Sequence, residues 1–226
     1  VLGAGGGVIS NTGGGTLTLA GAISKDGTKL TLGGGVFDVT GQITGASANS
    51  DLIVNNGAAV TLTNANNTYN GPTLVNGGAT LKNGVTNALP AGTTVILGEA
   101  TNNTAGTYDL NGFDSTVTAL AGAGTGSKTV TNSAAGTGTS KLSITGAGTF
   151  GGTIQDGATA KTALTKSGTG TFALTGSNTY TGSANYFFRN DGFVAANKHS
   201  AGASFNTKDT AFTIGGPVFK NKLWGF

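Results

Sequence analysis

The stretch LTKSGTGTFALTGSNTYTG (Leu164–Gly182) contains the pattern that decides the fold. Apolar and small polar residues alternate over four or five positions, and each short run ends at Gly or Asn. Such alternation places one face of a strand inside and the other outside. The same plan recurs in TLTLAGAISKDGTKLTL (Thr16–Leu32) and KLSITGAGTFGGTIQDG (Lys141–Gly157). We therefore expect many short strands and almost no helix.

The alternation also predicts which side chains form the core. The intervening Thr, Ser and Ala residues then face solvent or a neighbouring face. The expected inward positions are Leu17, Leu19, Leu30, Leu32, Val60, Leu62, Leu142, Ile144, Phe172 and Leu174.

The corners between strands are marked by Asn-Gly and Asp-Gly pairs, which tolerate the positive φ of a sharp bend. Frequent corners and short strands suit a coil in which each strand stacks about 4.8 Å from its counterpart. Turns of roughly 20 to 25 residues would give about eight turns and a rod roughly 40 Å long. We expect stacked Asn and Thr side chains to add hydrogen bonds between turns. The pairs begin at Asn56, Asn70, Asn76, Asn83, Asn111, Asp26, Asp156 and Asp191.

The composition leaves little for catalysis. The chain has 226 residues, of which 42 are Gly and 9% are charged, and it has no Cys, which excludes disulfides, thiolate zinc sites and cysteine nucleophiles. His199 is the only histidine and Arg189 the only arginine. Asp109 and Asp114 flank Asn111-Gly112 and either approach one another or, as we favour, cap turn amides. We predict no enzyme, no cofactor and no metal site, with a polysaccharide-active β-helix enzyme as the competing hypothesis.

A boundary lies near Ser183, dividing a solenoid body (1–182) from a C-terminal segment (183–226). The first part holds seven Lys and seven acidic residues, whereas the second holds five basic and two acidic residues and nine of the 16 aromatic ones. The basic excess forms no sustained stripe, so nucleic-acid binding is not expected. No apolar run is long enough for a transmembrane helix. Because Val1 is not an initiator, we expect a processed chain or a fragment of a longer one.

Two stretches resemble a known family. Leu164–Gly182, quoted above, and TLTNANNTYNGPTLVNGGATLKNGVTNALPAGTTVIL (Thr61–Leu97) are similar to the autotransporter-associated β-strand repeat of bacterial passenger regions. The resemblance covers most of residues 10–182. It implies a right-handed parallel β-helix, export to the cell exterior, and a scaffold or adhesive role.

The C-terminal segment interrupts this repeat. Its end, TAFTIGGPVFKNKLWGF (Thr210–Phe226), resembles the junction of plug and barrel in TonB-dependent outer-membrane receptors. We interpret it as a short aromatic hairpin or extended tail that caps the last turn of the coil or adds a strand to another subunit. The candidate capping or inter-subunit contacts are Tyr186, Phe187, Phe188, Phe212, Ile214, Val218, Phe219, Trp224 and Phe226.

These observations predict an all-β protein: a parallel β-helix acting as an extracellular structural or adhesive surface protein. Any signal peptide would already be removed, and self-association into an oligomer or filament through the C-terminal segment is expected. Cell-surface or carbohydrate contact is a further expected partner. The alternative is a passenger fragment of a larger autotransporter or outer-membrane receptor.

Overall fold

The computed structural model describes residues 5–181, 184–188 and 210–214. Within these ranges the chain forms 22 short strands and no helix. The described part therefore contains no helix that could cross a membrane. The prediction of an all-β fold is confirmed.

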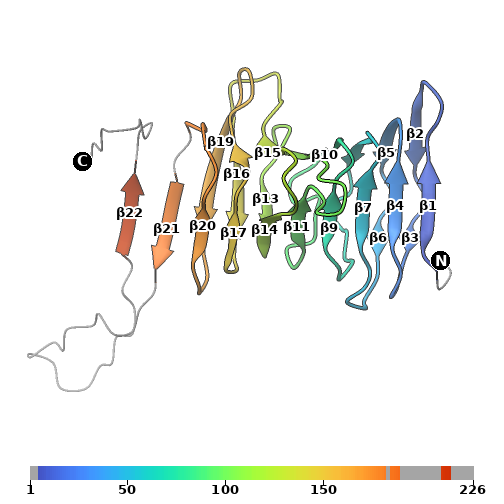
Figure 1. The fold of residues 1–226 in the computed structure, drawn as a ribbon, viewed down its shortest axis with the longest axis horizontal. Coiled ribbons are helices and arrows are strands. Elements are labelled where there is room, and N and C mark those ends of the chain that lie inside the picture. The colour runs from blue at the N-terminus through green and yellow to red at the C-terminus, as the bar shows by residue number, and fades with distance from the viewer. Residues whose placement is uncertain (1–4, 182–183, 189–209, 215–226) are drawn as a thin grey trace, which may run out of the picture.

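The strands stack along three sides of a coil that the chain visits in turn over about eight turns, and all of them pair parallel except the last. Figure 1 shows strands of successive turns side by side along the long axis, with β1 near one end and β22 at the other. The first sheet contains β1 (Gly7–Ser10), β4 (Leu30–Gly33), β7 (Leu52–Asn55), β9 (Thr73–Val75), β11 (Thr94–Leu97) and β14 (Ala119–Gly122). β17 (Gly148–Phe150) lies next to β14, and β20 (Phe172–Leu174) pairs with β17.

The other two sides of the coil are built in the same way. The second sheet contains β2 (Thr16–Leu19), β5 (Val36–Val39), β8 (Ala59–Leu62), β10 (Ala79–Asn83), β12 (Gly106–Asp109), β15 (Lys128–Thr131) and β18 (Thr153–Ile154). The third side begins with the pair β3 (Ile23–Ser24) and β6 (Ile43–Thr44). It continues with β13 (Ser115–Val117), β16 (Thr139–Ile144), β19 (Lys161–Lys166), β21 (Ala184–Phe188) and β22 (Thr210–Ile214).

The register between turns confirms the predicted repeat length for most turns, although Ala79 pairs with Gly106 and Ser115 with Leu142 at separations of 27 residues (106 − 79 and 142 − 115). Leu30 pairs with Leu52 and Leu52 with Thr73, which are separations of 22 (52 − 30) and 21 (73 − 52) residues. Because both strands of each pair keep the same inward positions, every turn adds its apolar residues to one continuous core.

One column of side chains shows how that core is built. It runs through the second sheet, and each member from the second onward is fully buried. Burying a large apolar side chain contributes roughly 1.5–3 kcal/mol, so stacking supplies most of the favourable free energy of folding. The column consists of Leu17, Phe37, Val60, Leu81, Tyr108, Val130 and Ile154.

The predicted inward residues all face the core, and their exposure follows their place along the rod. The six in the middle turns are buried: Leu30, Leu32, Val60, Leu62, Leu142 and Ile144. The four nearest the ends of the described coil are only partly buried: Leu17, Leu19, Phe172 and Leu174. They have a neighbouring turn on one side that covers them, and less cover on the other.

The corner prediction is only partly right. Asn56 and Asn111 have φ of 51° and 47°, as expected for sharp corners. The pairs Asn70-Gly71, Asn83-Gly84 and Asp156-Gly157 are different, because neither residue of each pair has a positive φ. Glycine is required at residue 71 by close approach, since a Cβ on Gly71 would lie 2.4 Å from the carbonyl oxygen of Ser50. Asp191 lies outside the described residues.

Candidate functional site

The phrase Asn-Thr-Tyr occurs at residues 67–69 and 178–180, and its first copy bonds to the turns on both sides. Asn67 Oδ1 accepts a hydrogen bond from the N–H of Ile43 at 2.7 Å, and the N–H of Thr68 donates to the Ile43 carbonyl at 2.9 Å. Asn67 Nδ2 donates to the carbonyl of Ala88, in the following turn, at 2.8 Å. One buried amide therefore links three successive turns.

The second copy repeats this arrangement. Asn178 Oδ1 accepts from the N–H of Ile154 at 2.9 Å, and the N–H of Thr179 donates to the Ile154 carbonyl at 2.9 Å. In both copies the Asn and Ile are 24 residues apart. We call each set of two bonds an Asn-Thr bridge: Asn67 and Thr68 with Ile43, and Asn178 and Thr179 with Ile154. The repeated phrase serves to join one turn to the turn before it.

The tyrosine of the first phrase points into the core. Tyr69 is 2% exposed, and its hydroxyl lies 2.7 Å from Thr73 Oγ1, which in turn lies 3.1 Å from Thr93 Oγ1. Burial raises the pKa of Tyr69. Tyr108 is similar, since burial raises its pKa to about 12 and its hydroxyl bonds to Asn83 and Ser115. Both hydroxyls are therefore internal hydrogen-bonding groups.

A lysine also lies inside the coil. Lys25 is fully buried, its Nζ donates to the carbonyl of Ser50, and it lies 4.1 Å from the centroid of the Tyr69 ring. Burial lowers the pKa of Lys25 to about 7, and the nearby charge of Asp51 offsets only part of that effect. We did not predict this residue, although the alternation Ile23, Lys25 places it on the inward side. With no exposed surface, its amine is closed to any external substrate.

The aspartates connect turns from the outside. Asp26 Oδ1 accepts from the N–H of Ser47 at 2.8 Å, and this bond lowers the pKa of Asp26. Asp156 accepts from the N–H groups of Thr162 and Thr181. Burial raises the pKa of Asp156, but these and other hydrogen bonds outweigh it and hold the pKa below its ordinary value.

Asp109 and Asp114 are predicted to cap turn amides, which is confirmed for Asp109 but not for Asp114, because Asp114 bonds to an amide inside strand β16. Asp109 Oδ1 accepts from the N–H groups of Asn111 and Ser133, each at 2.9 Å, and Asp114 Oδ1 accepts from that of Lys141 at 2.8 Å. The expected Asn ladders differ in detail, because several Asn side chains bond to carbonyls of the neighbouring turn rather than to each other. Examples are Asn64 with Thr40, Asn70 with Ala46 and Asn111 with Asn83.

Asp109 is also the centre of a small charged cluster. Ser133 Oγ donates to its Oδ2 at 2.5 Å, and Lys82 Nζ lies 3.4 Å from the same oxygen. The hydroxyl and the ammonium group are thus both directed at one carboxylate that is itself bonded to two amides. A serine nucleophile would need a free base beside it, and here the neighbouring groups are already paired.

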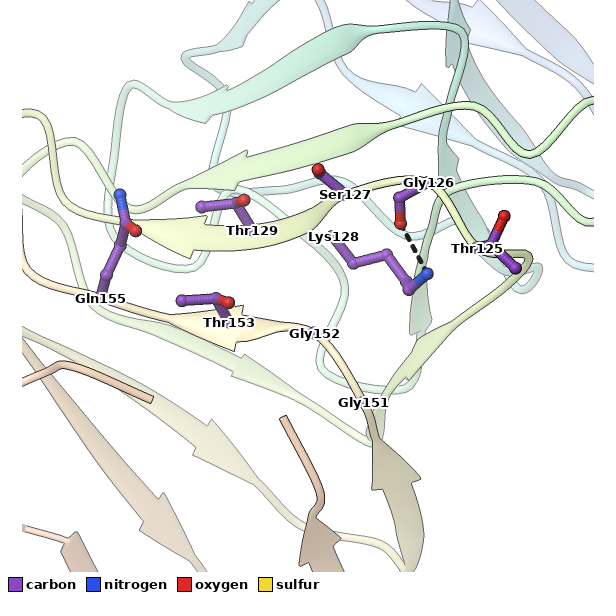
Figure 2. A pocket seen from close by; sticks show the side chains of 9 residues that line it. All are labelled: Thr125, Gly126, Ser127, Lys128, Thr129, Gly151, Gly152, Thr153 and Gln155. Carbon is purple, nitrogen blue, oxygen red and sulfur yellow. Dashed lines mark hydrogen bonds between the residues drawn. The ribbon is translucent and has the colours of Figure 1, made fainter. Parts of the chain in front are cut away.

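A polar hollow of about 250 Å³ opens beside β15 and β18. Figure 2 shows hydroxyl and amide groups of Ser127, Thr129, Thr153 and Gln155 around it, with Lys128 lying across one side. Lys128 Nζ donates to the carbonyls of Gly124 and Gly126 at 2.6 and 2.7 Å. The lining includes no carboxylate, so it provides hydrogen-bonding groups but no acid and base pair.

Within the described ranges, no three His, Cys, Asp or Glu residues lie close enough to hold a metal ion. His199 and Arg189 lie outside those ranges.

The residues predicted as capping or inter-subunit contacts fall into two groups. Tyr186, Phe187 and Phe188 lie on β21, and Phe212 and Ile214 lie on β22. The backbone of β21 extends the third sheet parallel to β19, and β22 pairs with β21 antiparallel, with Tyr186 opposite Phe212. The other four, Val218, Phe219, Trp224 and Phe226, lie outside the described residues.

Comparison with known families agrees with this arrangement. Residues 52–82 and 164–185 match the family model of the passenger-associated-transport-repeat. These two stretches are passenger-type repeats. The matched passenger repeats contain the two Asn-Thr-Tyr phrases, so each includes the asparagine and threonine of one Asn-Thr bridge. This repeat implies an exported or cell-surface protein.

The other comparisons add nothing to the passenger assignment. The searches of curated proteins and of solved structures return no match. The resemblance of the C-terminal residues to TonB-dependent receptors finds no support in the family comparison.

Proposed function

We propose that this protein is an extracellular structural protein of a bacterial surface, in which the coil is a stiff spacer. The observation that carries the proposal is that both copies of the Asn-Thr-Tyr phrase form an Asn-Thr bridge. Both Asn-Thr bridges tie a turn to its predecessor, and the aspartates at the corners do the same. Polar groups that are committed to neighbouring turns stiffen a rod and are unavailable to a substrate.

The C-terminal segment is proposed to cap the coil. A parallel coil exposes unpaired backbone at its last turn, and an exposed edge invites pairing with another chain. The antiparallel strand β22 occupies the outer edge of β21, where the next parallel strand of a longer coil would lie. This pairing supports a cap formed within one chain.

Self-assembly is the second candidate, and it would use the same two strands. If β22 of one copy pairs with β21 of another, the segment connects subunits and builds filaments. Electron microscopy of the intact chain beside a version ending at Gly182 separates the two. Regular filaments from the intact chain alone would establish the connector and overturn the cap. Monomeric rods from the intact chain, with end-to-end aggregation of the shortened one, are expected for the cap.

Adhesion to carbohydrate is proposed from the polar hollow beside β15 and β18. Its hydroxyl and amide groups suit the hydroxyls of a sugar, and Gln155 lies at one end of the lining (Figure 2). A glycan array probed with the protein and with Gln155→Ala tests this. Binding that the substitution abolishes would support adhesion, and equal binding or no binding by both would reject this site.

The spacer role itself is tested on cells. Displaying the chain between an outer-membrane anchor and an epitope should hold the epitope away from the surface, as measured by antibody access through the surface polysaccharide. Equal access for the chain and for an unstructured Gly/Ser linker with the same number of residues would contradict a stiff spacer.

A further inference from the structure

The five Asn-Gly pairs of the described residues differ in whether the backbone N–H of the glycine is held by a hydrogen bond. In such a pair the backbone nitrogen of Gly can attack the side-chain carbonyl carbon of Asn, and the absence of a side chain on Gly leaves the approach open. Reaction requires the two atoms to come within about 3–3.5 Å in a suitable orientation. A glycine N–H that is donated to a fixed acceptor holds its nitrogen away from that geometry.

Four of the five glycine amides are held in this way. Their acceptors lie in neighbouring turns, at 2.8 or 2.9 Å. The bonds run from Gly57 to the Gly77 carbonyl, from Gly77 to Thr104 Oγ1, from Gly84 to the Leu62 carbonyl and from Gly112 to Asn132 Oδ1. Two of the asparagines, Asn56 and Asn111, are also fixed in the left-handed region, and Asn83 is fully buried.

Asn70-Gly71 is the exception. Asn70 is exposed and does not have a positive φ. The N–H of Gly71 has no acceptor among the described residues, whereas the amide of Asn70 itself donates to the Gly45 carbonyl at 2.7 Å. The Asn70 side chain makes one bond, from Nδ2 to the Ala46 carbonyl at 3.1 Å, at an exposed position.

We propose that Asn70 is a site of spontaneous deamidation in the folded protein. The Gly71 nitrogen loses its proton and attacks Asn70 Cγ, the Cγ–Nδ2 bond breaks, and ammonia leaves with that proton. Water then opens the five-membered imide at one of its two carbonyls. The product is Asp, with the original backbone, or isoaspartate, with one extra methylene in the backbone.

The change removes a link between turns. Asn70 Nδ2 is a donor to the preceding turn, and a carboxylate in its place would face the Ala46 carbonyl with no proton to donate. An exported protein is not resynthesised in place, so the modified fraction grows with its age.

The test uses the full chain held at pH 8.5 and 37 °C, with tryptic peptides sequenced by mass spectrometry at intervals. The control is the same chain in 8 M urea, where the five pairs react at similar rates. We expect Asn70 to gain 1 Da about tenfold faster than the other four in the folded state, because each of those must first break a hydrogen bond. Equal rates in the folded state, or a faster reaction at another pair, would overturn the proposal.

A second variant tests the cause. Thr104→Val removes the hydroxyl that accepts from Gly77 while keeping the shape of the side chain. The reaction at Asn76 should then accelerate severalfold, and the rate at Asn70 should not change. Asn70→Gln serves as the matched control that loses the signal at Asn70 alone. No acceleration at Asn76 would show that the hydrogen bond is not what protects it.

Discussion

The buried lysine gives the sharpest prediction about stability. Lys25 is fully buried, with its amine bonded to the Ser50 carbonyl and placed over the Tyr69 ring. Substitution by Met keeps the length of the side chain and removes the amine. We expect Lys25→Met to abolish most of the increase in stability that the native protein shows between pH 6 and pH 9.

The sign follows from proton binding. The pKa of Lys25 is about 7 in the folded protein against 10.5 for the ordinary group. Between those two values the unfolded chain binds the proton and the folded chain does not, so the free energy of unfolding rises with pH. Because a full unit of pKa difference corresponds to about 1.4 kcal/mol, the rise from pH 6 to pH 9 is between about 2 and 3 kcal/mol. Buried Tyr69 and Tyr108 oppose this only above about pH 10, where unfolded tyrosines ionise.

The assay is urea unfolding at pH 6, 7, 8 and 9, followed by circular dichroism in the far ultraviolet. Lys29→Met is the matched control, since that side chain is 62% exposed and lies four residues away. The native protein and the control should become more stable by the same amount as the pH rises. If Lys25→Met shows the same rise as both of them, the amine is not desolvated as the structure indicates, and the reasoning fails.

Three further substitutions test contacts between turns. Asn67→Ala should cost about 2 to 4 kcal/mol in urea unfolding, because it leaves a buried amide and a buried carbonyl without partners. Asn178 bonds to one neighbouring turn among the described residues, so Asn178→Ala should cost less, and equal losses would contradict this. Gly106→Val should cost at least about 3 kcal/mol, since a Cβ there would lie 1.9 Å from a backbone carbonyl oxygen. Gly92→Ala, whose added Cβ would have nothing within 4 Å, should be neutral, and similar melting temperatures for the two variants would refute the close approach at Gly106. Asp156→Asn should reduce the loss of thermal stability as the pH falls from 5 to 3, because the hydrogen bonds that lower the pKa of Asp156 stabilise the fold only while its carboxylate is ionised. If the variant loses as much thermal stability as the native protein over this pH range, the hydrogen bonds of Asp156 contribute little.

The sequence predicts the coil well because its signal is local. The alternation at Leu30 and Leu32, or at Leu142 and Ile144, determines which face of the strand is inside. The repeat of 20 to 25 residues predicts that each strand stacks on its counterpart in the next turn. The exposure of residues near the ends, such as Leu17, depends on how many turns cover them, and the alternation alone does not predict that number.

The contacts between turns were harder to predict. Asn67 and Asn178 each bond to an isoleucine 24 residues earlier, a separation that only the register between turns defines. Lys25 was overlooked because charge normally indicates the surface, although its position in the alternation is inward. For Tyr186 and Phe212 the backbone pairing is described, while their capping role stays a prediction.

The central claim is that the coil is a stack of equivalent turns held together by contacts between neighbours. Gly106 pairs with Lys128, so deletion of residues 106–127 removes 22 residues (128 − 106), one full turn, and preserves every inward position. Deletion of residues 106–116 removes half as many, an odd number, and inverts the alternation. Small-angle X-ray scattering of the one-turn deletion should give a folded rod about 5 Å shorter than the intact protein. An expanded, unfolded profile, like the one we expect for the half-turn deletion, would contradict the account.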